Sequence, residues 1–248
     1  MGTDKNLAKA EMKARGRPLQ KMFDRVPSRY DFLNRLLTFR LDEYWRDRAV
    51  RRIMDEKPGR VMDLGTGTGD MAVRIARKSP GVQVTGYDFS APMLEVARRK
   101  AGRYHLDNVQ FVEGDAASMP FDDNSFDVVG ISFAFRNITF KNPYTGQYLK
   151  ETLRCLKPGG KFVIVETSQP RNLVVRKIFH AYFHYLVSGL GGRISGARGA
   201  YHYLAYSARH FYTREELTRL LEDHGFAGTE HRPMLLGASA ITIATKPQ

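Results

Sequence analysis

The sequence predicts an α/β fold in which one mostly parallel, seven-stranded sheet carries helices on both faces. Two observations lead to this prediction. Short apolar runs alternate with helical stretches from residue 60 onward, and a glycine-rich turn directly follows the first of these runs. The chain has 248 residues, of which 42% are hydrophobic and 11% aromatic, so it is long and apolar enough for one large domain. We therefore expect a single domain over residues 1–248.

Residues 1–57 are predicted to form an N-terminal helical cap. Residues 1–20 are charged and have no clear apolar face. From Lys21 to Met54, apolar residues recur at helical spacing, which predicts two or three short helices. Pro58 and Gly59 then end them.

Residues 58–169 are predicted as the core of the sheet, and residues 210–248 complete it with a helix and two strands. Strands are expected at Arg60–Leu64, Val82–Tyr87, Val109–Val112, Phe126–Ser132, Lys161–Glu166, Gly228–Met234 and Ala238–Thr245. Helices are expected at Asp70–Lys78, Ala91–Ala101, Gly146–Leu156 and Thr213–Gly225, the last with a capping box. Pro158, Gly159 and Gly160 are a stop signal after the third helix.

Residues 170–209 do not fit the alternation and are predicted to be an inserted helical lid. An amphipathic stretch from Val174 to Val187 leads into the glycine-rich residues Ser188 to Gly199, and a tyrosine cluster follows.

Composition limits the compartment and the class of partner. The single cysteine, Cys155, excludes an intramolecular disulfide, and the N-terminal residues have no apolar core of a secretory signal, so we expect a cytoplasmic protein. The longest uncharged apolar stretch, Ile178 to Gly192, is too short to span a membrane. A net charge of +13 favours contact with something anionic: nucleic acid, lipid headgroups or acidic metabolites.

The strongest local motif is the glycine turn after the first strand, with Gly65, Gly67 and Gly69 at alternate positions. Glycine lets a ligand approach the backbone closely, and the amides at the start of the next helix can bind a polar group. Such a loop alone is a weak signal, because dinucleotide sites use a related turn. Asp88, which ends the second strand, can accept both ribose hydroxyls, and Asp115 after the third strand could reach an adenine amino group.

This set of motifs over residues 60–167 resembles the Rossmann-like class I S-adenosylmethionine-dependent methyltransferases. The resemblance implies S-adenosylmethionine as the cofactor and an expected binding set of Asp63, Gly65, Gly67, Thr68, Gly69, Asp88, Phe89, Asp115 and Ala116. Asp63 is expected at the amino acid end of the cofactor, Asp88 at the ribose, and Asp115 with Ala116 at the adenine.

Further motifs are similar to the menaquinone and ubiquinone C-methyltransferases and extend the resemblance over nearly the whole chain. They are Met22–Val26, Tyr30–Leu37, Trp45-Arg46, Phe121, Asp127, Ser132–Asn137 and Tyr201–Ser207. The resemblance implies a prenylated quinol as the methyl acceptor. It also implies that Ser132 closes the cofactor pocket and that Arg136 and Asn137 face the acceptor.

The chemistry gives Arg136 a role, because methylating a ring carbon requires the neighbouring phenol to become a phenolate. A guanidinium near that oxygen would stabilise the anion. A charged loop capped by an amide is an equally good interpretation of Arg136-Asn137. The general base is open among Tyr30, Asp31, Glu166, His202 and a water held by Arg136, with Tyr30 and Arg136 preferred. His180 and His184 are interpreted as lid or surface residues, and no metal is expected.

Demethylmenaquinol is the preferred acceptor, and a ubiquinone-pathway ring is the alternative. The sequence departs from the family pattern at Gly196–Ala200 and at Thr167–Pro170, so the acceptor end of the site is open to difference. The apolar face of the lid, flanked by Arg171, Arg176 and Lys177, suggests peripheral contact with an anionic membrane, and a homodimer is left open. Packing of that lid helix on the sheet is an equally good interpretation. Methylation of RNA or of another small molecule, and cofactor binding without catalysis, are rival hypotheses. RNA is disfavoured, because the chain carries no RNA-methylation motif or added RNA-binding module.

Overall fold

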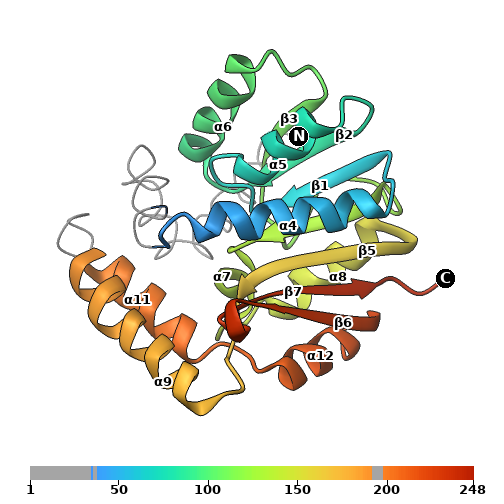
Figure 1. Ribbon diagram of the computed structural model, residues 1–248. Helices are drawn as coiled ribbons and strands as arrows, with labels where there is room; N and C mark the ends of the chain where they lie inside the picture. Colours follow the sequence, from blue (N-terminus) through green and yellow to red (C-terminus); the bar gives the residue numbers. More distant parts are fainter. Residues whose placement is uncertain (1–34, 36–37, 192–197) are drawn as a thin grey trace, which may run out of the picture.

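The computed structural model describes residue 35 and residues 38–191 and 198–248. Within them, seven strands form one sheet: β1 (Arg60–Leu64), β2 (Gln83–Asp88), β3 (Val109–Glu113), β4 (Phe126–Ser132), β5 (Leu156–Thr167), β6 (Ala227–Met234) and β7 (Ser239–Thr245). Their order is β3-β2-β1-β4-β5-β7-β6, and β7 runs antiparallel to both of its neighbours (Figure 1). The predicted mostly parallel, seven-stranded sheet is therefore confirmed.

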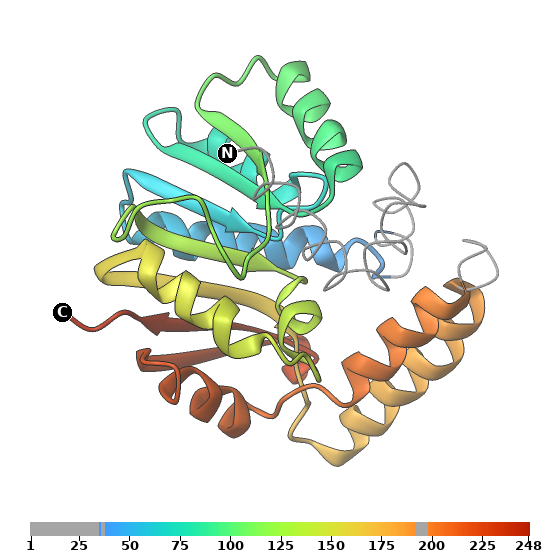
Figure 2. The same ribbon diagram turned by 180° about the vertical axis from the view of Figure 1, so that it is seen from behind.

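Helices cover both faces of this sheet (Figures 1 and 2). One face is covered by α4 (Leu41–Asp55) and α5 (Asp70–Lys78), and the other by α8 (Thr145–Cys155) and α12 (Arg214–Glu222). Successive residues of the central strands point to opposite faces of the sheet and so pack in different cores. On β1, Val61 packs in the α4–α5 core and Met62 in the α8–α12 core, which is why these strands are apolar at nearly every position.

Two further helices lie at the sheet's margins. The helix α6 (Ala91–Arg103) packs beside β3, and the short helix α7 (Phe135–Thr139) follows β4. The sequence did not predict α7, because five residues are too few to display a helical period. Of the predicted N-terminal cap, the structure describes the helix α4. The helices predicted before α4 fall outside the described residues.

The helix α8 ends at Cys155, just before the stop expected at Pro158–Gly160, and these three residues form part of a bulge inside β5. Leu156 pairs with Phe126 and Lys161 with Val128, so residues 157–160 lie opposite the single residue Asp127. The carboxylate of Asp127 accepts hydrogen bonds from the backbone amides of Gly59 and Arg60 and from Lys157 Nζ. Asp127 thus connects the bulge of β5 to the start of β1.

The predicted lid is a hairpin of helices beside the end of the sheet (Figure 2). Its first arm is α9 (Leu173–Ala181), continued by a π-helix from Tyr182 to Gly191, and its second arm is α11 (Arg198–Arg209). The first arm therefore continues beyond the predicted end at Val187, into the stretch expected to be glycine-rich loop. In the part of the chain that the structure describes, no helix has the length and apolar character needed to cross a bilayer.

Candidate active site

The glycine turn after β1 lies at the carboxyl edge of the sheet and has a backbone conformation that favours glycine. Gly65, Gly67 and Gly69 all have positive φ angles, of 64°, 54° and 79°. A β-carbon at Gly65 would lie 2.7 Å from the Cβ of Ala134, and one at Gly69 equally close to Ala97, whereas one at Gly67 would meet nothing within 4 Å. Gly65 and Gly69 are therefore required by packing, and Gly67 leaves its space to a cavity.

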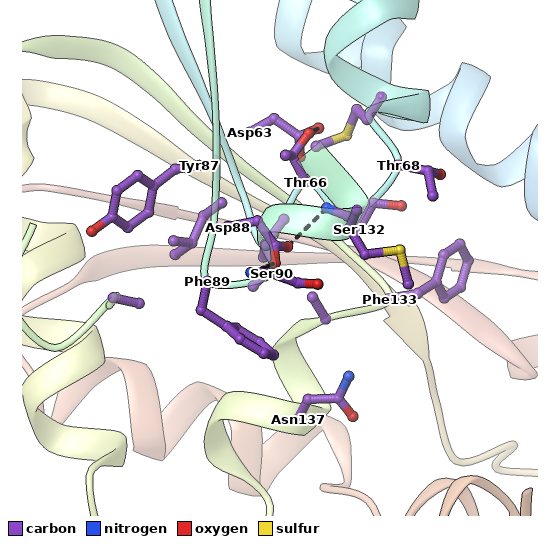
Figure 3. A pocket seen from close by; sticks show the side chains of 18 of the residues that line it. Asp63, Thr66, Thr68, Tyr87, Asp88, Phe89, Ser90, Ser132, Phe133 and Asn137 are labelled. Carbon is purple, nitrogen blue, oxygen red and sulfur yellow. Dashed lines mark hydrogen bonds between the residues drawn. The ribbon is translucent and has the colours of Figure 1, made fainter. Parts of the chain in front are cut away.

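That cavity, here called the loop cavity, lies at the carboxyl ends of β1, β2 and β4 (Figure 3). Nine of the residues predicted for the site line it: Asp63, Gly65, Gly67, Thr68, Asp88, Phe89, Ala116, Ser132 and Asn137. The carboxyl edge of a parallel sheet is the usual location for a ligand in this architecture.

Asp63, at the end of β1, is a carboxylate with one oxygen unused. The side chain is 1% exposed. Its Oδ2 accepts hydrogen bonds from Thr66 Oγ1 (2.6 Å) and from the amide of Ala72 (2.9 Å), while Oδ1 has no hydrogen-bond partner among the described residues. Burial raises the pKa of Asp63 to about 7, although these hydrogen bonds favour the anion. A ligand that brings a cation to Oδ1 would satisfy this group.

Asp88, at the end of β2, is fixed by backbone amides. Its Oδ2 accepts from Gly67 (2.8 Å) and its Oδ1 from Ser90 (2.9 Å). These two bonds orient the carboxylate, which lines the loop cavity. Asp88 is thus able to accept hydroxyl hydrogen bonds from a ligand in the loop cavity.

Asp115, which was expected to contact the adenine together with Ala116, lies outside the lining of the loop cavity. Gly114 and Ala116 line the loop cavity, but Asp115 does not, and its Oδ1 accepts from the amide of Ala117 (2.9 Å). Gly69 is likewise outside the lining and is the N-cap residue of α5. Backbone and Ala116, rather than the Asp115 carboxylate, form this end of the cavity wall.

A second cavity of about 460 Å³, here called the lid cavity, lies between the lid, α4 and the end of the sheet. Its lining is mostly apolar. The lid contributes Val175, Ile178, Phe179, Tyr182, Phe183, Val187 and Leu204, and the body contributes Phe39, Leu41, Trp45, Phe133, Leu235, Leu236 and Ala238. The charged side chains in this lining are Asp42, Arg46 and Arg136.

Arg136 and Asn137 are neighbours on α7 but face different cavities. Arg136 lines the lid cavity and is 3% exposed; its Nη1 donates to Glu166 Oε1 (3.0 Å) and to Thr167 Oγ1 (2.7 Å). Asn137 lines the loop cavity, so the two side chains, which were expected to face the acceptor together, face different cavities. The helical turn of α7 separates the two side chains by roughly 100°, which explains the difference.

Phe133 and Arg46 line both cavities and form the wall that they share. Phe133 has a φ of 54°, which is unusual for a bulky residue, and its amide donates to the carbonyl of Val165 (2.9 Å). Arg46 Nε donates to Ser132 Oγ (3.2 Å), and its guanidinium lies 5.3 Å from the centre of the Phe133 ring. Sequence reasoning gave Arg46 no role, because an Asp and an Arg four residues apart on a helix are typical of an exposed pair.

The remaining candidates fall outside these cavities or outside the described residues. Tyr30 and Asp31 lie in the part of the chain that is not described. His202 is exposed on α11. His180 Nε2 lies 3.1 Å from Gln169 Oε1, and His184 Nδ1 lies 3.4 Å from Arg209 Nη1.

Comparisons with known proteins agree with this arrangement. A model of the ubiE/COQ5 methyltransferase family matches residues 9–246. The chain is 39% identical to the demethylmenaquinone methyltransferase of Chlorobaculum tepidum, over 99% of this chain and 100% of that protein. It is 38% identical to the ubiquinone/menaquinone biosynthesis C-methyltransferase UbiE of Geobacter sulfurreducens, over 98% and 94%. A SAM dependent methyltransferase from Aquifex aeolicus superposes with a TM-score of 0.55 at 17% identity, over 79% of this chain and 88% of that one, which shows the class I methyltransferase fold.

Proposed function

Because the chain belongs to the ubiE/COQ5 methyltransferase family and is an S-adenosylmethionine-dependent C-methyltransferase, we propose that its acceptor is a prenylated quinol, specifically demethylmenaquinol. The relative from Chlorobaculum tepidum is named a demethylmenaquinone methyltransferase. The observation that carries the proposal is the lid cavity, a large apolar space that shares the wall of Phe133 and Arg46 with the loop cavity. Such a space suits an acceptor with an isoprenoid tail.

The residues of the loop cavity fit S-adenosylmethionine. The unpartnered Oδ1 of Asp63 suits the ammonium of the amino acid part, and the oriented carboxylate of Asp88 suits the ribose hydroxyls. The open space at Gly67 allows the ligand to lie on the backbone. When bound, this cofactor supplies a methyl group that is already electrophilic, so positioning of the acceptor is the main task of the protein.

Polar groups in the lid cavity fit the two ring oxygens of a quinol. Trp45 Nε1 and Arg136 Nε are buried donors with no hydrogen-bond partner among the described residues, and both residues line this cavity. We assign Arg136 to the oxygen beside the methylated carbon, where its charge would stabilise the phenolate. Asn137, in the wall of the loop cavity, is proposed to fix the end of the cofactor that approaches the acceptor.

For the general base we keep Tyr30 and a water held by Arg136. Two other candidates are less suitable: Glu166 is engaged by the Arg136 guanidinium at 3.0 Å, and His202 is exposed on the lid. A base must lie within hydrogen-bond reach of the phenol and be able to accept its proton. The ion-paired Glu166 and the exposed His202 meet these conditions less well.

A ubiquinone-pathway ring is the second candidate acceptor. The name of the relative from Geobacter sulfurreducens covers both quinone pathways. The lid cavity is apolar enough for either prenylated ring, so the two acceptors have to be compared directly.

We further propose that the acceptor reaches the lid cavity from a membrane with anionic headgroups. Phe39, Ile178, Leu235 and Leu236 line this cavity and are each more than half exposed. Leu235 and Leu236 also have positive φ angles of 45° and 53°, a costly conformation for leucine. With Lys177 exposed on the adjacent helix α9, this mouth combines apolar side chains with positive charge. Homodimer formation stays a prediction.

The test is transfer of labelled methyl from S-adenosylmethionine to reduced demethylmenaquinone in liposomes, with a ubiquinone precursor and bulk RNA as parallel acceptors. Label on a carbon of the menaquinone ring, at a higher kcat/KM than for the ubiquinone precursor, is the expected result. Label on RNA alone, or on neither quinol despite cofactor binding, would overturn the acceptor assignment and leave the family assignment intact.

A further inference from the structure

Arg46 is a buried arginine in the wall between the two cavities. It lies on α4 and is 8% exposed. Its Nη1 donates to Asp42 Oδ2 (2.7 Å), one helical turn earlier, and its Nε donates to Ser132 Oγ at the end of β4 (3.2 Å). Asp42 and Ser132 offset the cost of burying this guanidinium and hold it at the edge of the loop cavity, which Arg46 lines.

Arg46 lies at the end of the loop cavity that also contains the carboxylates of Asp63 and Asp70. Asp70 Oδ2 lies 3.8 Å from Arg46 Nη1. Burial acts to raise the pKa of Asp70, but the charges of Arg46 and Lys100 outweigh it and hold that pKa below its usual range. The charge of Arg46 also favours the anion of Asp63, whose Oδ1 is the unpartnered oxygen described above. A buried cation and an unsatisfied carboxylate therefore line the same end of one cavity.

An α-amino acid group has the complementary pair of charges. Its ammonium suits Asp63, and its carboxylate requires a positive group close by. We propose that Arg46 binds the carboxylate of the amino acid part of S-adenosylmethionine, while Asp42 orients the guanidinium. A guanidinium carries five N–H donors in a fixed planar array, so Arg46 can donate to Asp42, to Ser132 and to a ligand carboxylate together, whereas a lysine has a single nitrogen. The inference rests on the use of this cofactor and does not depend on which acceptor is methylated.

A purely structural function is the competing explanation, because Arg46 also contacts Ser132 and the ring of Phe133. The two explanations predict that a substitution of Arg46 lowers the binding affinity of different sets of ligands. A carboxylate-binding residue affects only ligands that carry the carboxylate, whereas a residue that supports the wall affects every ligand of the loop cavity.

Calorimetry with three ligands separates these explanations. S-adenosylhomocysteine carries the whole amino acid group, decarboxylated S-adenosylmethionine retains the ammonium without the carboxylate, and 5′-methylthioadenosine has neither. The variant is Asp42→Asn with Arg46→Met, which removes the buried pair together and leaves no unpaired buried carboxylate. The matched control on the same helix is Asp55→Asn with Arg52→Met, which removes the pair joined at 2.8 Å near the other end of α4.

We expect the Asp42/Arg46 variant to bind S-adenosylhomocysteine roughly 10- to 100-fold more weakly, the range for a lost charged hydrogen bond. Its affinity for 5′-methylthioadenosine should stay within about twofold of the unaltered protein. Its affinity for decarboxylated S-adenosylmethionine should fall clearly less than that for S-adenosylhomocysteine, because loss of the Arg46 charge raises the pKa of Asp63 but removes no carboxylate contact. The Asp55/Arg52 control should leave all three affinities unchanged.

Equal weakening for all three ligands would overturn the proposal in favour of a structural function, and unchanged affinity for S-adenosylhomocysteine would place the carboxylate elsewhere. If the double variant does not fold, Arg46→Lys keeps the charge but not the paired geometry. For this variant a loss of at least about fivefold confined to S-adenosylhomocysteine supports the proposal, and an equal or absent loss overturns it.

Discussion

The guanidinium of Arg136 lies 3.0 Å from the carboxylate of Glu166, and both side chains are 3% exposed. The pair joins α7 to the end of β5, so it fixes the position of the lid cavity wall relative to the sheet. Removing one member of such a buried pair typically costs about 3–5 kcal/mol of unfolding free energy, because the other charge is left uncompensated. Tests of Arg136 must therefore separate loss of function from loss of fold.

Arg136→Lys retains the charge and is expected to reduce turnover at least about tenfold, because lysine lacks the planar donor array that fits both Glu166 and an acceptor oxygen. Affinity for S-adenosylhomocysteine should stay within about twofold, since Arg136 lies outside the lining of the loop cavity. Single-turnover kinetics with calorimetry measures both quantities. Unaltered turnover would remove Arg136 from its proposed role at the phenolate.

Gly67→Ala should weaken S-adenosylhomocysteine binding more than about tenfold, because the added Cβ projects toward the loop cavity. Gly228→Ala is the matched control: its φ is 59° against 54° for Gly67, and it lies in β6. Both substitutions should cost about 1 kcal/mol of unfolding free energy through the same backbone strain. Equal affinities in the two variants would show that Gly67 does not contact the ligand.

The raised pKa of Asp63, about 7, predicts opposite pH effects on stability and on binding. The folded protein favours the protonated carboxyl, so this group's contribution to stability is full below pH 4 and is lost as pH rises through 7. Binding of a ligand ammonium requires the anion. Affinity for S-adenosylhomocysteine should accordingly rise about eightfold between pH 6 and pH 7.5, the change in the ionised fraction of such a group.

Calorimetry at the two pH values tests this, with Asp63→Asn as the comparison. The variant should bind weakly and without this pH dependence. A profile that is flat in the unaltered protein would contradict the assignment of Asp63 to the ammonium.

Leu235→Asn with Leu236→Asn should reduce binding to phosphatidylglycerol-containing liposomes at least about tenfold, because two exposed apolar side chains are lost from the lid cavity mouth. Asparagine tolerates positive φ, so the free energy of unfolding should not fall. Cosedimentation measures the binding, and Tyr104→Asn, an exposed aromatic on the far side of the fold after α6, is the control. Retained binding in the double variant would exclude this mouth as the membrane contact.

Much of the fold was predictable because the central strands are buried on both faces. The bounds predicted for β1, β4 and α5 agree residue by residue with the structure, since apolar runs and amphipathic periods change sharply there. The β5 bulge was not predictable, because its proline and glycines also fit an ordinary turn, and only the pairing of Leu156 with Phe126 distinguishes them.

The site was predictable where motifs fix backbone geometry, as at Gly67 and Asp88. It was less predictable where the direction of a side chain decides. The turn of α7 points Asn137 to the loop cavity and Arg136 to the lid cavity, and Asp115, whose Oδ1 accepts from the amide of Ala117, does not line the loop cavity. Trp45-Arg46 is one of the motifs that carry the resemblance, but the sequence assigned Arg46 no role, because only the folded α4 shows that its side chain is buried at the loop cavity.

The two ends of the lid lie side by side, where Gln169 Nε2 donates to the carbonyl of Ala208 at 2.8 Å. An insertion whose ends meet adds little constraint to the sheet that carries it, so its sequence can diverge at small cost to folding. If the acceptor binds in the lid cavity as proposed, a chimera that replaces residues 170–209 with those of a relative would change the choice of acceptor while the residues of the loop cavity stay the same.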